Sequence, residues 1–302
     1  MRIGYVGLGA MGGALARHLV PKHTVTVFDL NPAALSEFTA LGARTAKSCA
    51  ELARESEIVL LCLPRSSDVE RVLFGPAGLA EGLAPGSIVV DQTSGVPGET
   101  RSFAVRLAQQ GVGMVDAPVS GNQAAARGGT ISIIASGPGA VYGKVEAVLK
   151  DISPNVMYCG ERVGNGQMMK TVNNLFNVST RFATLELVAL GRKLGLPLEQ
   201  LTEALTATAG RSHTSRVMLP AIAQGRETVK FHLALQVKDM NQAITLGTAE
   251  GVPMPIGVAA RSLLQIGLSS LGPHAQLEDM IGVVERMAGT RFVDAAAKEG
   301  AT

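Results

Sequence analysis

The chain has few cysteines, no surplus of either charge and no long hydrophobic run. Its 302 residues include 27 basic and 25 acidic ones, a formal net charge of +2, without any concentrated basic stretch. This balance gives no support to nucleic acid or a membrane surface as a partner. The longest strongly apolar run, 58–63, has the length of a strand, whereas a bilayer span needs ~20 residues. We therefore expect no membrane span and small molecules as partners.

The metal-binding and disulfide-forming residues are scattered. Three cysteines, Cys49, Cys62 and Cys159, form an odd set that fits reduced thiols in a cytoplasmic enzyme better than a disulfide framework. The five histidines have no spacing suited to zinc, so we expect no metal. A hydrophobic fraction of 46% with 17% charged residues describes a globular protein that is long enough for two domains.

The first half of the chain alternates short β-branched runs with helical patterns. Strands are expected at 2–6, 24–29, 57–64, 87–92, 113–118 and 130–136, and helices at 11–20, 32–41, 67–73, 98–110 and 140–149. Strand–helix–strand units of about 30 residues with continuously apolar strands indicate a parallel sheet covered on both faces. The sequence therefore predicts a doubly wound α/β domain over residues 1–162.

The second half, 163–302, is expected to be all-helical. Helical patterns cover 167–194, 198–208, 235–250, 255–268 and 276–287. Apolar residues occupy more faces of these helices than one small domain can easily cover. This surplus predicts a homodimer or homotetramer, and it is carried by Leu187, Val188, Leu190, Leu201, Leu205 and 258–271.

A glycine motif follows the first expected strand. Gly7, Gly9 and Gly12 form G-x-G-x-x-G, the pattern in which a tight turn brings backbone groups, here with Leu8, Ala10 and Met11, against a dinucleotide pyrophosphate. Asp29 ends the second strand, where a carboxylate binds the adenosine ribose hydroxyls and repels a 2′-phosphate. No arginine follows it, which favours NAD over NADP. The alternative is an ordinary glycine turn with Asp29 capping the next helix.

Two further strand ends carry candidate ligand-binding residues. Ligands of open α/β sheets bind outside the carboxyl ends of the strands. Leu63 and Pro64 follow one strand, and Thr93 and Ser94 follow another, so these four residues are expected to line the nicotinamide side. Each of them could instead be only a turn or cap residue.

The stretch after Asp116 offers a site for a carboxylate. Ser120, Gly121 and Asn122 place a hydroxyl, a glycine backbone and an amide within one turn. A plain Ser-Gly turn would have a similar sequence.

Lys170 is the candidate acid–base group. It lies in an expected helix with Asn173 and Asn174, and residues three and four apart share a helix face. Burial of a lysine lowers its pKa toward neutrality, and ligands often bind next to domain boundaries such as the one expected here. The alternative is a surface lysine on an amphipathic helix.

Four segments, in order, resemble the motifs of the β-hydroxyacid dehydrogenase family. GLGAMGGALARHL is similar to its cofactor motif, DAPVSG to its substrate motif, GNGQMMKTVNN to its catalytic motif and VKDMNQA to its fourth motif. The family includes 3-hydroxyisobutyrate dehydrogenases, tartronate semialdehyde reductases and, more distantly, phosphogluconate dehydrogenases. The resemblance covers nearly the whole chain.

The resemblance implies a Rossmann-type domain and hydride transfer between NAD and a small 3-hydroxy acid. It implies that Lys170 is the catalytic acid–base, that Asn174 and Asn173 bind the lysine or the reacting oxygen, and that Ser120 and Gly121 bind the substrate carboxylate. It further associates Lys238 with the cofactor, and Asp239 and Phe231 with the substrate. From the residues alone, Asp239 could also be a structural ion-pair partner.

The sequence departs from the family pattern at two positions. Asn122 replaces the second glycine of the usual S-G-G, and Met240 stands for a leucine. The first change adds a polar side chain beside the expected carboxylate site, so the substrate cannot be carried over from familiar members.

Two other functions compete with this one. An imine reductase would share the fold, but the lysine and the DAPVSG turn argue against it. A non-catalytic nucleotide-binding protein is expected to lack the lysine, which is present here. Arg211 and His213 remain open, because either could reach a second carboxylate or a polyol group, or merely flank a helix.

Overall fold

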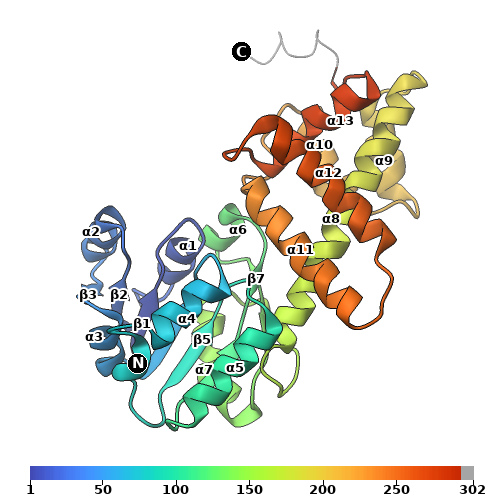
Figure 1. Cartoon of the computed structure of the whole chain (residues 1–302). Coiled ribbons are helices and arrows are strands. Elements are labelled where there is room, and N and C mark those ends of the chain that lie inside the picture. The colour runs from blue at the N-terminus through green and yellow to red at the C-terminus, as the bar shows by residue number, and fades with distance from the viewer. Residues whose placement is uncertain (294–302) are drawn as a thin grey trace. The chain divides into compact units, whose positions relative to one another are not determined.

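The computed structural model describes residues 1–293, which fall into two compact units, Met1–Lys170 and a second one that begins at Thr171 (Figure 1). The division falls inside one long helix, α8 (Asn165–Lys193), so the first turn of α8 belongs to the first unit. Each unit is described by itself.

The first unit is built on a six-stranded sheet in the order β3-β2-β1-β4-β5-β6. All of its strand pairs are parallel. The order reverses between β1 and β4, which is where ligands of doubly wound sheets bind. The strands are β1 (Arg2–Val6), β2 (Thr24–Phe28), β3 (Arg44–Thr45), β4 (Ile58–Leu61), β5 (Ile88–Asp91) and β6 (Gly113–Asp116).

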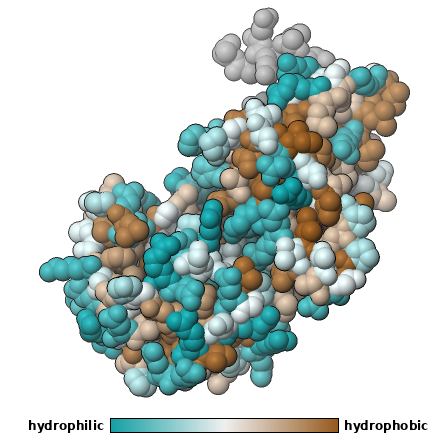
Figure 2. Space-filling model, viewed as in Figure 1, coloured by the Kyte–Doolittle hydropathy of each residue, from teal (hydrophilic) through white to brown (hydrophobic). Residues whose placement is uncertain are grey.

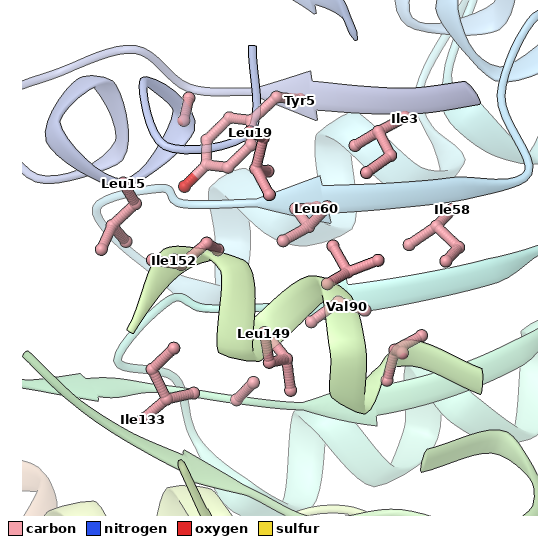
Figure 3. Close-up of a cluster of buried hydrophobic side chains, with 14 of the residues drawn as sticks. Ile3, Tyr5, Leu15, Leu19, Ile58, Leu60, Val90, Ile133, Leu149 and Ile152 are labelled. Carbon is pink, nitrogen blue, oxygen red and sulfur yellow. The ribbon is translucent and has the colours of Figure 1, made fainter. Parts of the chain in front are cut away.

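Helices cover both faces of this sheet because every central strand is apolar on both sides. Ile58 and Leu60 of β4 pack with Leu149 and Ile152 on one face (Figure 3). Val59 packs on the other face in a separate cluster. The helices are α1 (Gly12–Ala16), α2 (Pro32–Ala40), α3 (Cys49–Arg54), α4 (Ser66–Phe74), η1 (Leu79–Glu81), α5 (Pro97–Ala108), α6 (Gln123–Arg127) and α7 (Gly139–Ile152).

A second, small sheet was not expected from the sequence. It has the order β7-β8-β9, from β7 (Val119–Ser120), β8 (Ser132–Ala135) and β9 (Val156–Tyr158). Strand β8 pairs antiparallel with β7 and parallel with β9. The expected strand at 130–136, which contains β8, therefore belongs to this small sheet and not to the main one. β7 has two residues and β9 three, which is too short to leave a periodic pattern.

The second unit is helical in its described part, up to residue 293. Its core joins Phe182, Leu185 and Val188 of α8 to residues of the later helices. The sequence prediction was therefore wrong for Val188, which is fully buried, whereas Leu187 and Leu190 are exposed. Figure 2 shows hydrophobic residues on the visible surface of this unit. The remaining helices are α9 (Leu198–Ala207), η2 (Thr214–Met218), α10 (Leu219–Ala223), α11 (Leu233–Ala249), α12 (Pro255–Leu271), η3 (Leu277–Asp279) and α13 (Met280–Ala288).

The described residues contain neither a membrane-spanning helix nor a cluster of metal ligands. None of their helices is both long and apolar enough to cross a membrane. Within residues 1–293, no cluster of three or more histidine, cysteine and acidic side chains is arranged to hold a metal ion.

Candidate active site

The glycine turn after β1 has the shape that a dinucleotide needs. Gly7 has φ +95°, and a Cβ there would strike the carbonyl oxygen of Cys62 at the end of β4. A Cβ on Gly12 would strike the carbonyl oxygen of Gly7, so α1 can start this close to β1 only without a side chain. A Cβ on Gly9 would meet nothing within 4 Å. The open side of the turn is therefore at Gly9, where a pyrophosphate approaches the backbone in this motif. These residues fit the cofactor.

Asp29 holds the same turn in place. One carboxylate oxygen accepts a hydrogen bond from the backbone N–H of Leu8 at 2.6 Å, and the other accepts from Asn31 N at 2.8 Å. The side chain that caps α2 is Asn31, which accepts from Ala33 N. Asp29 thus stands at the end of β2 against the nucleotide turn, and it is not the cap of the next helix.

The loops after β4 and β5 are tied to each other. The backbone N–H of Leu63 donates to Thr93 Oγ1 at 3.1 Å, and Val96 N donates to Ser66 Oγ at 2.8 Å. Thr93 is buried, while Pro64 is exposed. The structure therefore brings the two predicted loops together at the carboxyl edge of the sheet.

Asp116, at the end of β6, binds the N-terminus of α8. Its Oδ1 accepts hydrogen bonds from Ser136 Oγ at 2.5 Å and Gly164 N at 2.7 Å, and its Oδ2 accepts from Gln167 N at 2.8 Å. These backbone N–H groups have no partner inside a helix, and the positive end of the helix dipole attracts a carboxylate. Asp116 is fully buried. Asp116, at the end of β6, therefore caps the N-terminus of α8.

Gln167, in the first turn of α8, extends the connection to the β5 loop. Its Oε1 accepts from Gly95 N at 2.9 Å, and its Nε2 donates to the carbonyl oxygen of Thr93 at 2.7 Å. Gln167 is also buried, at 1% exposure. Lys170 lies three residues further along α8 and is partly buried. The start of the helix that carries it is thus fixed to the carboxyl ends of β5 and β6.

The two glycines of GNG allow this close approach. Gly164 has φ +93°, and a Cβ there would lie 2.9 Å from the carbonyl oxygen of Pro97. A Cβ on Gly166 would strike the carbonyl oxygen of Ile134 and would lie 2.8 Å from Asp116 Oδ2. Both glycines are therefore required by packing against the strands.

Two buried carboxyl groups lie in this region. Burial raises the pKa of Asp91 to about 7, although hydrogen bonds from Thr93 act in the opposite direction. Burial also raises the pKa of Asp116, opposed by the hydrogen bonds from Ser136, Gly164 and Gln167. Because all three contacts of Asp116 come from donors, both of its oxygens serve as acceptors, which favours the ionised carboxylate.

The predicted carboxylate turn follows β7. Ser120 is partly buried, Gly121 is exposed with φ +146°, and Asn122 is exposed. Asn122 Oδ1 accepts from Ala125 N at 2.9 Å, so this side chain caps α6. The next residue, Gln123, donates to the carbonyl oxygen of Ala10 at 3.0 Å and links this turn to the nucleotide loop. Sequence reasoning did not select Gln123.

In the helical unit, the fourth motif contacts the catalytic one. Asp239 on α11 accepts a hydrogen bond from Asn174 Nδ2 at 3.0 Å and forms an ion pair with Lys238 at 3.0 Å. The Asp239 side chain is 10% exposed, so this contact is largely shielded from water. Phe231 packs against the helical core, and Asn173 is exposed.

Known proteins match the chain over both units. A family model described as the NAD binding domain of 6-phosphogluconate dehydrogenase matches residues 2–160, and one described as the NAD-binding domain of NADP-dependent 3-hydroxyisobutyrate dehydrogenase matches 164–284. The 2-(hydroxymethyl)glutarate dehydrogenase of Eubacterium barkeri is 32% identical over 96% of each chain. The L-threonate dehydrogenase of Cupriavidus necator is 32% identical over 92% of this chain and 93% of its own.

A solved structure agrees with these matches. The 3-hydroxyisobutyrate dehydrogenase of Mycobacterium tuberculosis, solved with L-serine, superposes with a TM-score of 0.86 at 26% identity, over 95% of this chain and 98% of that one. The chain belongs to the β-hydroxyacid dehydrogenase family. It is therefore an oxidoreductase, a nicotinamide-dependent 3-hydroxyacid dehydrogenase.

The residues that were not predicted from the sequence are those that hold the N-terminus of α8. Asp116, Ser136 and Gln167 were not selected as functional, although Asp116 begins the DAPVSG segment. The available signal was an acidic residue at the end of an apolar strand. Its partners could not be identified because they lie 48 and 51 residues away in the chain.

The packing of Gly166 gives a stability prediction. Gly166→Ala should lower the free energy of unfolding by about 1–3 kcal/mol, because the added Cβ overlaps backbone at Ile134 and the capping carboxylate. The control is Gly143→Ala in the middle of α7, where a Cβ meets nothing within 4 Å, so this change should be neutral or stabilising. Urea unfolding of both variants measures the difference. Equal stability of the two would show that the contact at Gly166 is not tight.

Proposed function

We propose that this enzyme transfers a hydride between NAD and a small 3-hydroxy acid, with Lys170 as the acid–base group. The observation that carries the proposal is the attachment of the first turn of α8 to the carboxyl ends of β5 and β6. This attachment brings a lysine to the edge of the sheet where a nicotinamide cofactor binds in doubly wound folds. The presence of the lysine in the family's catalytic motif supports the same role.

The protein has three tasks besides holding the cofactor, which supplies the hydride acceptor when bound. It must bind the substrate, orient its hydroxyl and move one proton. In oxidation Lys170 accepts the proton of the 3-hydroxyl, and in reduction it returns that proton to the carbonyl oxygen. Asn174, oriented by its hydrogen bond to Asp239, binds the lysine or the reacting oxygen. The Lys238 ion pair with Asp239 would stabilise that arrangement, and the cofactor contact that the resemblance implies for Lys238 stays a prediction.

The substrate class is a small hydroxy carboxylate. The names of the two similar dehydrogenases, 2-(hydroxymethyl)glutarate and L-threonate, both denote hydroxy carboxylates, which supports this class. Ser120 and the backbone of Gly121 would bind the carboxylate. Asn122 would act mainly through the shape of this turn, because its side-chain oxygen caps α6.

Loss of Lys170 should remove the chemistry and leave cofactor binding intact. Lys170→Ala should lower kcat by about 10²- to 10⁴-fold, the usual range for a positioned proton-transfer group. Lys170→Arg should not restore activity, because a guanidinium does not release its proton at any working pH. Steady-state kinetics on a panel of 3-hydroxy acids, followed at the absorbance of the reduced cofactor, gives the substrate and the rate together.

The matched control is Lys193→Ala, an exposed lysine at the other end of the same helix. It should keep wild-type kcat, and NAD affinity by fluorescence titration should be the same in all three variants. If Lys170→Ala kept more than about a tenth of wild-type kcat, the lysine would not be the acid–base group.

Asp29 should make the enzyme prefer NAD. Its carboxylate lies against the nucleotide turn, where it would repel a 2′-phosphate, and the segment that follows has no arginine. The family descriptions include both cofactors, so kcat/KM must be measured with NAD and with NADP. A higher value for NAD is expected. An equal or higher value for NADP would refute the assignment.

A homodimer or homotetramer is the proposed assembly, formed by two or more copies of the helical unit. Leu187, Leu190 and Leu194 lie at a spacing of three and four residues on α8, and they are 58, 54 and 71% exposed. Such a stripe normally packs against another helix. Light scattering should give a multiple of the chain mass, and Leu187→Lys with Leu190→Lys should give the monomer. The control Val105→Lys, an exposed residue of α5, should stay assembled, and a monomeric wild type would contradict the proposal.

A further inference from the structure

Arg181, in the middle of α8, is a buried cation whose charge is not neutralised within the described residues. Its side chain is almost completely enclosed, with 4% of the residue exposed. Nη2 donates a long hydrogen bond of 3.4 Å to Asn177 Oδ1, whereas Nε and Nη1 have no acceptor. Among residues 1–293, no carboxylate lies within ion-pair distance of Arg181. Buried arginines are ordinarily paired, so this one requires an explanation.

Two further basic side chains, His213 and Arg216, lie near Arg181. Burial lowers the pKa of His213, and the positive charges of Arg181 and Arg216 lower it further. His213 and Arg216 are exposed, so this cluster reaches the surface at the start of η2.

Gln236 adds a second unpaired donor on the neighbouring helix. The contacts Thr171–Gln242 and Asn174–Asp239 show that α8 and α11 run in opposite directions, stepping three residues on each helix. Extended by one more step of three residues, this spacing pairs Gln236 with Asn177, the residue that binds Arg181. Gln236 is 6% exposed, and its Nε2 has no hydrogen-bond partner. Two separate buried side chains therefore present unsatisfied N–H groups in this region.

The backbone next to His213 has an unusual geometry that also supports a binding site here. Residues Thr214–Met218, directly after His213, form a π-helical turn, and such turns are found frequently at functional sites. The buried hydroxyl of Thr214 also lacks a partner.

We propose that Arg181 is the anchor of an oxyanion-binding site in the helical unit, completed by Gln236 Nε2 and entered past His213. The ligand class is a carboxylate or a group of similar charge and geometry, because a guanidinium fork binds two oxygens of such groups at once. The proposal gives the region of His213 a ligand. Arg181, which would bind that ligand, was not selected from the sequence. It stands apart from the proposed dehydrogenase chemistry at Lys170.

The ligand is a free anion in solution, because Arg181 lies three helical turns from Lys170 on α8 and so beyond the reach of a small substrate bound there. The site can therefore be tested without any substrate.

The stability experiment compares thermal unfolding of the full chain in sodium sulfate, in sodium malonate and in sodium chloride at equal ionic strength. Sulfate also stabilises proteins non-specifically, so the readout is the difference between variants. The control Arg226→Met, an exposed arginine of the same unit, should show the wild-type rise in Tm. Arg181→Met should show a rise smaller by about 2–4 °C, because a ligand that binds only the folded state raises its stability.

Arg181→Met should fold, since it replaces an unpaired buried charge by an apolar chain of similar length. Gln236→Leu, which removes a donor that has no partner, gives an independent variant with a reduced anion response. If both variants respond to sulfate and malonate as the wild type does, no oxyanion binds at Arg181 and the proposal is overturned.

Discussion

The arrangement of the first unit depends on one buried carboxylate at the end of β6. Asp116 replaces the missing hydrogen-bond partners of the α8 N-terminus, and its two oxygens are fully used by a hydroxyl and two backbone N–H groups. Burying a charge is costly unless it is paired and hydrogen-bonded, and here both the donors and the helix dipole compensate for that cost. Removing the carboxylate would leave several buried donors unsatisfied at once. The start of α8 is therefore fixed to the sheet edge.

This anchoring extends across the sheet edge through polar side chains. Gln167 joins the helix to the β5 loop, Thr93 joins that loop to the β4 loop, and Gln92 accepts a hydrogen bond from Tyr5 of β1 at 2.8 Å. Such buried networks hold the segments they join in fixed positions, and among the polar side-chain atoms of these residues only Gln92 Nε2 lacks a partner. The parts of the unit that would hold the cofactor and the part that carries Lys170 are thereby connected by hydrogen bonds, and a displacement of one affects the others.

Local sequence signals were sufficient for the architecture. The apolar strands and the G-x-G-x-x-G turn predicted the Rossmann-type unit, because a parallel sheet covered on both faces requires continuous apolar runs. The small sheet β7-β8-β9 was missed since two of its strands have only two and three residues. The resemblance placed GNG in the catalytic motif without giving its glycines a role, whereas the structure shows that Gly164 and Gly166 are required by backbone contacts that no local pattern reveals. Asp116 and Arg181 were missed for the same reason, because burial and pairing depend on residues distant in sequence.

The central claim is that the Asp116 carboxylate positions the helix that bears the catalytic lysine, and Asp116→Asn tests it most directly. The substitution keeps the size of the side chain but removes the charge and turns one acceptor into a donor that faces backbone N–H groups. On an identified 3-hydroxy acid, kcat should fall about 10- to 10²-fold, as expected when a reacting group is misplaced by about 1 Å, while the dissociation constant for NAD stays within about two-fold of wild type. A folded Asp116→Asn enzyme with wild-type kcat, or one that loses NAD affinity in proportion to kcat, would contradict the account.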